Sequence, residues 1–320
     1  YDKIRLIKQP ELEMPIRSLS NVSYDDKEGY FKLQDKVKSR TLTASTIKTF
    51  AQTLRMMGLS KQLIETKDIA TKREAYYVSK NWGDARFKEQ PESDSVMDDI
   101  EAMIAVNREQ IGFLPEEKGG DVAGAYSVPS SVEELKFETN AKFILAIETA
   151  GMFQRLVKHN YWKKSNCILI SMGGVPTRAC RRFIRRLADD KKIPVYVFTD
   201  DHPYGWLNIY RTLTDGSGNA AHINEYFCVP QAQFIGITAK DITEYKLPSH
   251  PLKDVDMKRI KDGIKNDPFV KHHKQWEKAL KDMMKMKVRA EQQALAKHGL
   301  NFVISDYLPN KLKNPKSWLP

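Results

Sequence analysis

Two patterns of hydrophobic and polar positions divide this chain of 320 residues. In the N-terminal part, apolar residues recur every three or four positions, which is the spacing of amphipathic helices. The helices predicted from this spacing span residues 43–57, 59–66, 71–82 and 95–110. Gly58 is expected to end the first of them. The segment before the helices, residues 15–38, is strand-like and has a turn at residues 25–29.

In the C-terminal part, short apolar runs without alternation predict strands that are buried on both faces. These strands span residues 143–147, 168–171, 195–199 and 234–237. Helices are predicted over residues 152–158 and 177–187, between the strands. Because strands alternate with helices, we expect a parallel sheet with right-handed crossovers. A long amphipathic helix is expected over residues 268–297.

A segment rich in Gly, Pro, Ser and Glu, residues 115–131, separates these two patterns. We predict a winged-helix (CAP-like) domain over residues 1–135, including a linker near residues 115–135, because short helices and small strands are typical of that fold. Residues 136–320 are predicted to form a second domain, with a mainly parallel sheet followed by C-terminal helices. The fold class is therefore α/β by its sheet and α+β over the whole chain.

Composition narrows the class of partner. Lys and Arg number 52 against 41 Asp and Glu, so the formal net charge is +11. A surplus of this size favours a polyanionic partner, either nucleic acid or an anionic membrane. No apolar run is long enough to span a bilayer, so nucleic acid leads and no membrane partner is expected. The three cysteines fit neither a disulfide framework nor a zinc site, which predicts a reducing, cytoplasmic setting.

The first candidate for chemistry is the predicted helix that carries Arg73, Tyr76 and Tyr77. A tyrosine has a pKa of about 10 and becomes a nucleophile only when its proton is drawn off or its charge is compensated. Arg73 lies four residues before Tyr77, so on a helix the two side chains share a face. A guanidinium there could hold a phosphate against the phenolic oxygen. The alternative is a pair of packed tyrosines beside a solvated Lys72 and Arg73.

The second candidate consists of two acids at strand ends. Glu148 follows the strand over residues 143–147, and Asp200 follows the strand over residues 195–199. The carboxyl ends of parallel strands meet at one edge of a sheet, where ligands bind. Two carboxylates there predict a Mg²⁺ site, because Mg²⁺ takes few protein oxygens and keeps waters and phosphates. The alternatives are that Glu148 caps the next helix and that Asp200 lies in an ordinary polar loop.

The third candidate is a basic helix that opens after Gly173 and Gly174. A helix N-terminus favours phosphate, although the lysine and spacing of a nucleotide-binding P-loop are absent. Arg178 and Arg182 fall on one stripe of this helix, which could follow a DNA backbone. A solvated basic face is the alternative.

Five segments in this order resemble the family of the topoisomerase VI A-subunit, which shares its pattern with the meiotic double-strand-break proteins. They read T-K-R-E-A-Y-Y, F-K-E-Q-P-E-S-D, A-I-E-T-A-G-M-F, G-G-V-P-T-R-A-C-R-R-F and D-D-H-P-Y-G. The resemblance runs from about residue 15 to the C-terminus. It implies that the second domain is a Toprim domain. It also implies an archaeal type IIB DNA topoisomerase that makes a transient double-strand break.

The resemblance assigns roles to these residues. Tyr77 would attack a DNA phosphodiester and form a 5′-phosphotyrosyl link, while Tyr76 would only pack beside it. Arg73 would assist, Lys72 would contact DNA, and Glu148 and Asp200 would bind the metal.

The resemblance also implies partners. In this family the tyrosine of one protomer meets the metal site of the other, so a homodimer on double-stranded DNA would be the catalytic unit. A separate ATPase, the B-subunit of the enzyme, would complete a heterotetramer and would alone use ATP. Such a complex would be cytoplasmic and associated with the nucleoid.

The chain departs from the family pattern at His202, which stands where a second Asp is expected. Imidazole suits Mn²⁺ or Zn²⁺ better than Mg²⁺. Three outcomes are open: His202 binds a softer metal such as Mn²⁺, Asp201 replaces it, or Glu148 and Asp200 hold Mg²⁺ weakly. Two other functions also remain open, a DNA-binding scaffold with a weakened metal site and a meiotic-type break-maker.

Overall fold

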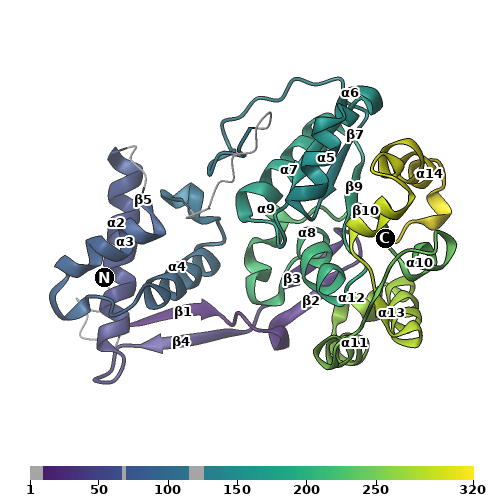
Figure 1. Cartoon of the computed structure of the whole chain (residues 1–320). Coiled ribbons are helices and arrows are strands. Elements are labelled where there is room, and N and C mark those ends of the chain that lie inside the picture. The colour runs from purple at the N-terminus through teal and green to yellow at the C-terminus, as the bar shows by residue number, and fades with distance from the viewer. Residues whose placement is uncertain (1–9, 67–69, 115–125) are drawn as a thin grey trace.

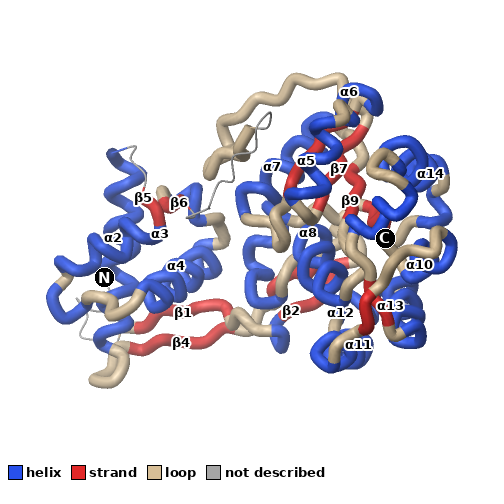
Figure 2. The backbone as a smooth tube through the Cα atoms, in the orientation of Figure 1, coloured by secondary structure: helices blue, strands red, loops and turns tan. Residues whose placement is uncertain are grey.

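The computed structural model of the chain describes residues 10–66, 70–114 and 126–320. Figure 1 shows two lobes: one contains α2, α3 and α4, and the other contains the main sheet with the remaining helices. The strands β1 (Glu11–Pro15) and β4 (Val37–Thr41) form an antiparallel pair along the side of the first lobe. Figure 1 shows that this pair extends between the two lobes. Figure 2 shows that the strands of the second lobe lie among helices.

The first lobe has a small hydrophobic core between its helices. These are α2 (Ile47–Thr66), α3 (Lys72–Val78) and α4 (Gln90–Ile104). A short parallel pair, β5 (Ala70–Thr71) and β6 (Phe113–Leu114), closes one side. The core contains Met56, Phe87, Met97 and Phe113, none of which is exposed to solvent.

Three expectations for this lobe need correction. Gly58 does not end a helix, because α2 continues through it to Thr66 with Met56, Ser60 and Leu63 all buried. A glycine inside a helix costs only about 1 kcal/mol, which packing on both sides offsets. The helix predicted over residues 71–82 is α3 followed by a 3₁₀ turn from Ser79 to Asn81. The helix predicted over residues 95–110 begins earlier, at Gln90, and ends at Ala105, where the backbone turns left-handed.

The predicted turn at residues 25–29 joins the antiparallel hairpin of β2 (Val22–Asp25) and β3 (Tyr30–Leu33). This hairpin packs on the second lobe although it precedes the first in sequence. Phe31 is 2% exposed in the core of that lobe, and its carbonyl accepts a hydrogen bond from Asn224. The segment of the predicted linker from residue 126 to 131 is irregular, and residues 115–125 lie outside the described part of the chain.

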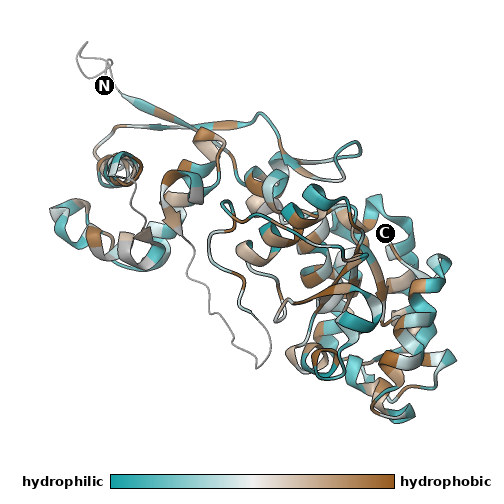
Figure 3. Ribbon diagram, turned by 90° about the horizontal axis from the view of Figure 1, so that it is seen from above, coloured by the Kyte–Doolittle hydropathy of each residue, from teal (hydrophilic) through white to brown (hydrophobic). Residues whose placement is uncertain are grey.

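The second lobe is built on a four-stranded parallel sheet of order β10-β9-β7-β8. Its strands are β7 (Phe143–Ile147), β8 (Cys167–Ser171), β9 (Val195–Phe198) and β10 (Gln233–Gly236). All four predicted strands are therefore confirmed, and so is their parallel direction. The strands are largely hydrophobic, whereas the surrounding helices carry more hydrophilic positions (Figure 3).

Two hydrophobic clusters cover the two faces of this sheet. The first cluster joins the sheet to α7 (Arg178–Lys191), α11 (Asp254–Asn266), α12 (Pro268–His272) and α13 (Lys274–Met286). The second joins it to α5 (Ala150–Lys158), α10 (Ala239–Glu244) and α14 (Leu308–Lys313). The sheet is therefore a covered middle layer, and only the ends of its strands are left to carry chemistry.

The prediction of one long helix over residues 268–297 is wrong. The chain breaks at His273 and again at Lys287, which adopts a left-handed conformation with φ of 56°. After Lys287 it forms β12 (Val288–Arg289), which pairs with β11 (His250–Pro251), and then a 3₁₀ segment from Gln292 to His298. In the described residues, no helix has the length and apolar character needed to cross a membrane.

Candidate active site

Glu148 and Asp200 meet at the carboxyl edge of the sheet, as predicted. They follow the neighbouring strands β7 and β9, in which Ile147 is opposite Phe198. The backbone N–H of Asp200 donates to Oε2 of Glu148 over 2.9 Å, and the backbone N–H of Glu148 donates to the carbonyl of Phe198 over 3.0 Å. Strand pairing therefore fixes where each of the two acids leaves the sheet. The N-cap of α5 is Thr149, not Glu148.

Burial disfavours the charged forms of both acids, and nearby carboxylates add to this effect. Burial, and then the charge of Asp200, raise the pKa of Glu148 to about 7. Burial is also the main reason why the pKa of Asp200 rises to about 6, with Glu291 adding to it. Half-buried acids side by side are typical of functional sites, because a bound cation compensates their charge.

The surroundings of this acid pair fit Mg²⁺. One oxygen of each carboxylate is already occupied, since Glu148 Oε2 accepts from Asp200 and Asp200 Oδ1 accepts from the backbone N–H of Gln292. Gly205 faces the pair, and a Cβ atom there would lie 3.2 Å from Glu148 Oε2, so the glycine keeps this space free of a side chain. Mg²⁺ needs only one or two carboxylates and completes its shell with water and phosphate.

His202 does not join the acid pair. Its Nδ1 accepts from the backbone N–H of Tyr204 over 3.0 Å, and its Nε2 lies 3.3 Å from Oδ1 of Asp256 and 2.6 Å from a guanidinium nitrogen of Arg289. Burial, opposed by the charge of Asp256, lowers the pKa of His202. Within the described parts of the chain, no group of three His, Cys, Asp or Glu side chains converges on one point.

Asp201 follows Asp200 directly in the chain but lies inside the protein. It is fully buried, and burial followed by the charges of Asp241 and Asp200 raises its pKa well above the ordinary value. Its backbone forms a bridge with Ala290, with hydrogen bonds of 2.8 and 3.1 Å. Neither carboxylate oxygen of Asp201 has a hydrogen-bond partner among the described residues, and the alternative that Asp201 replaces His202 as a ligand stays a prediction.

Tyr77 and Arg73 both lie on α3, but their side chains are outside the described part of the structure. Tyr76 is described. Its hydroxyl donates to the carbonyl of Lys88 over 2.9 Å, and Lys80 lies over its ring at 4.0 Å. These contacts fit the packing role expected for Tyr76. Lys72, expected to contact DNA, pairs with Asp94 over 2.6 Å.

The basic face of α7 is paired with acids and carbonyls of the protein. Arg178 donates to both oxygens of Glu101, over 2.8 and 3.3 Å, and so joins α7 to the first lobe. Arg182 donates to both oxygens of Glu133, over 2.6 and 2.8 Å. The expectation that Arg178 and Arg182 contact DNA stays a prediction. Contacts of either arginine with DNA phosphates would compete with these ion pairs. Sequence reasoning missed Glu101, since its partner Arg178 lies 77 residues later in the chain.

Glu101 has no exposed surface, yet its surroundings favour the charged form of its carboxylate. Burial by itself would raise its pKa, but His222, Arg108 and Arg178 outweigh burial and hold the pKa of Glu101 below its ordinary value. Arg108 donates to Oε2 of Glu101 over 2.7 Å. A charged carboxylate therefore holds two guanidinium groups at the contact between the lobes.

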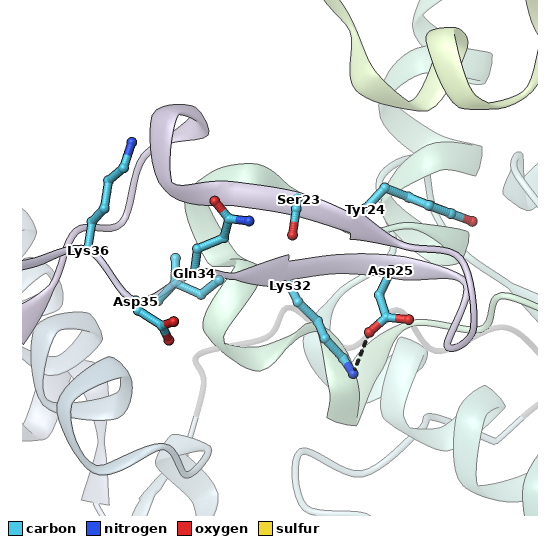
Figure 4. A pocket seen from close by; sticks show the side chains of 8 residues that line it. Ser23, Tyr24, Asp25, Lys32, Gln34, Asp35 and Lys36 are labelled. Atoms are coloured by element: carbon cyan, nitrogen blue, oxygen red, sulfur yellow. Dashed lines mark ion pairs between the residues drawn. The ribbon is translucent and has the colours of Figure 1, made fainter.

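A separate depression of about 680 Å³ runs along the hairpin of β2 and β3 (Figure 4). Its wall includes the ion pair between Lys32 and Asp25, at 2.9 Å. It is shallow and does not include Glu148 or Asp200. The acid pair at the sheet edge is therefore the stronger candidate for chemistry.

Two family models match the chain. Residues 143–312 match the Toprim domain shared by the topoisomerase 6 A-subunit and Spo11, and residues 48–113 match the type IIB DNA topoisomerase family. The parallel sheet with acids at its carboxyl edge is thus the sheet of a Toprim domain. Fold and matches together define the class, a type IIB DNA topoisomerase.

Curated relatives point to one component of such an enzyme. The A-subunit of type 2 DNA topoisomerase 6 from Methanocaldococcus jannaschii is 52% identical, over all of this chain and 93% of the relative. The proteins of the same name from Methanothermobacter thermautotrophicus and Pyrococcus abyssi are 34% and 35% identical, over 95% and 98% of this chain and 91% of each relative. This chain belongs to the topoisomerase VI A-subunit family.

Proposed function

We propose that this chain is the DNA-cleaving subunit of a type IIB topoisomerase and that Tyr77 is its nucleophile. The observation that carries this proposal is the pairing of Glu148 with Asp200 at the Toprim sheet edge, in a chain of this family. Tyr77 supports it from the other lobe, because it lies on α3 one turn after Arg73. The net charge of +11 suits double-stranded DNA as the substrate.

The reaction is a phosphoryl transfer that conserves the energy of the broken bond. The phenolic oxygen of Tyr77 forms a bond to phosphorus, the bond from phosphorus to the 3′ oxygen breaks, and the 5′ end stays on the tyrosine. The phenol loses its proton to solvent, and the leaving 3′ oxygen takes one up. Arg73, on the same face of α3, would stabilise the charge on the phosphate. Reversal reseals the strand.

Glu148 and Asp200 would hold Mg²⁺, with Mn²⁺ as an alternative. When bound, the metal would stabilise the charge on the scissile phosphate and on the 3′ oxygen. The chain itself positions the two carboxylates by strand pairing and keeps the space beside Gly205 open. Since His202 faces Asp256 and Arg289 and not this pair, we propose that it is not a ligand.

We further propose that two copies of the chain form each pair of active sites in trans. Within one chain, α3 lies in the first lobe, and the strands β7 and β9 that the acids follow lie in the second (Figure 1). Arg178 and Glu101 tie these lobes together, which opposes closure of one lobe on the other. A second copy could supply the tyrosine without breaking this contact.

The remaining proposals concern the rest of the complex. We propose that the first lobe is a winged-helix domain whose α3 lies against the duplex, that an ATPase B-subunit joins the homodimer in a heterotetramer, and that ATP acts only through that ATPase. The scaffold and break-maker alternatives lose support, since the acid pair is assembled without His202 and the relatives are topoisomerase subunits.

The test is complementation between two inactive variants. A Tyr77→Phe chain is mixed with a Glu148→Gln chain, and cleavage of plasmid DNA is measured with the ATPase partner and Mg²⁺. Mixed dimers that act in trans contain one intact site and one doubly defective site, so they should nick one strand. Each variant alone should be inactive. If the mixture is as inactive as its components, the trans arrangement is wrong.

A further inference from the structure

The buried side chain of Gln292 connects the two loops that carry the acid pair. Gln292 has no exposed surface and begins the 3₁₀ segment that follows β12. Its Nε2 donates to the carbonyl of Phe198 over 2.9 Å, and its Oε1 accepts from the hydroxyl of Thr149 over 2.8 Å. Phe198 ends β9, just before Asp200, and Thr149 directly follows Glu148.

The backbone of Gln292 also contacts one acid of the pair directly. The N–H of Gln292 donates to Oδ1 of Asp200 over 2.8 Å. Two residues earlier, Ala290 forms its two backbone hydrogen bonds with Asp201. The C-terminal segment is thus hydrogen-bonded along the loop that follows β9, and through Gln292 it also reaches the loop that follows β7.

The orientation of the amide follows from its partners. A backbone carbonyl can only accept, so the NH₂ group must face Phe198, and the carbonyl oxygen must face Thr149. The hydroxyl of Thr149 donates its hydrogen to Gln292, and its oxygen also accepts from the backbone N–H of Met152, over 3.4 Å. Both polar atoms of this buried amide are therefore satisfied, and neither can be lost without leaving a partner unpaired.

We propose that Gln292 is a positioning residue of the metal site, which sets the separation between Glu148 and Asp200. Strand pairing fixes where each acid leaves the sheet, but not how the loops beyond the strands are held. Outer-shell partners of metal ligands commonly contribute about 10- to 100-fold in metal affinity, because they orient the ligand oxygens. This inference rests on the proposed metal site.

The experiment measures metal binding and not activity. Mn²⁺ is titrated into the metal-free full chain, and the free ion is followed by electron paramagnetic resonance. Gln292→Met keeps the volume of the side chain and removes the amide. We expect its Kd for Mn²⁺ to rise about 10- to 100-fold. Gln293→Met is the matched control at the neighbouring exposed position, and its Kd should match that of the unaltered chain.

The outcomes separate this inference from the proposed function. A folded Gln292→Met chain with unaltered Mn²⁺ affinity overturns the role of Gln292 alone. An unaltered chain that binds no Mn²⁺, or a Glu148→Gln chain that binds as well as the unaltered one, overturns the metal site itself.

A second measurement does not depend on the folding of a variant. Mn²⁺ is added to the unaltered chain, and hydrogen exchange is followed by mass spectrometry. Peptides that cover residues 288–298 should exchange more slowly, together with those around Glu148 and Asp200. If Mn²⁺ slows exchange at the two acids but leaves residues 288–298 unchanged, the C-terminal segment is not part of the site.

Discussion

The backbone N–H of Asp200 donates to Oε2 of Glu148, so the loop that carries one acid is hydrogen-bonded to the other acid. The contact exists because β7 and β9 are neighbours and end at the same edge of the sheet. It places two half-buried carboxylates side by side, which is unfavourable when both are charged and favourable when a divalent cation lies between them. The acid pair therefore links stability, pH and metal binding.

Stability of the metal-free chain should fall as pH rises between about 5 and 7. Burial raises the pKa of Glu148 from 4.5 to about 7, so within this window the folded chain holds a proton that the unfolded chain releases. The same sign holds for Asp200, whose pKa rises to about 6. Thermal unfolding in EDTA at pH 5 and pH 8 measures the effect. Glu148→Gln should flatten this dependence, and an unchanged slope would show that Glu148 is not its source.

His202→Ala should leave the Kd for Mn²⁺ within about threefold of the unaltered value, well below the 10- to 100-fold loss expected even for an outer-shell partner. The reason is that His202 faces Asp256 and Arg289 and does not reach the acid pair. The measurement is the same Mn²⁺ titration. A rise of more than tenfold would make His202 a ligand after all.

Glu101→Gln should destabilise the chain by about 3 kcal/mol, because it removes the buried carboxylate from two buried or half-buried guanidinium groups and leaves them only the half-exposed carboxylate of Asp98. These belong to Arg108 and Arg178, which donate to Glu101 over 2.7 and 2.8 Å. Urea unfolding measures the loss. Glu133→Gln is the matched control: it also breaks a bidentate pair, with Arg182, but at a site where the acid is 33% exposed. Its cost should stay below about 1 kcal/mol, and equal losses would contradict a special role for Glu101.

Much of the second lobe could be predicted from the sequence. Its strands are continuous apolar runs, because both faces of the sheet are covered, and such runs are recognised without any knowledge of the partners. The position of Glu148 and Asp200 follows from the same topology, since both follow strands that turned out to be neighbours. Family resemblance added the roles of the residues, which periodicity alone left open.

Other features depend on contacts between distant segments and could not be predicted. The helical periodicity of residues 268–297 gave no sign of the breaks at His273 and Lys287, which tertiary packing imposes. Nothing in the sequence singles out Gln292, because its partners Thr149 and Phe198 lie far earlier in the chain. The sequence predicts a DNA-binding stripe on α7, but nothing in it shows that Arg178 pairs with Glu101.

The central claim is that a phenol on α3 becomes covalently linked to DNA, and trapping that link tests it most directly. Cleavage is stopped with denaturant, DNA is digested, and the modified peptide is identified by mass spectrometry. The unaltered chain and Tyr76→Phe should both carry a nucleotide on Tyr77, since the hydroxyl of Tyr76 donates to the carbonyl of Lys88. Tyr77→Phe should give no adduct. An adduct that survives in Tyr77→Phe, or that disappears in a folded Tyr76→Phe chain, would contradict the account.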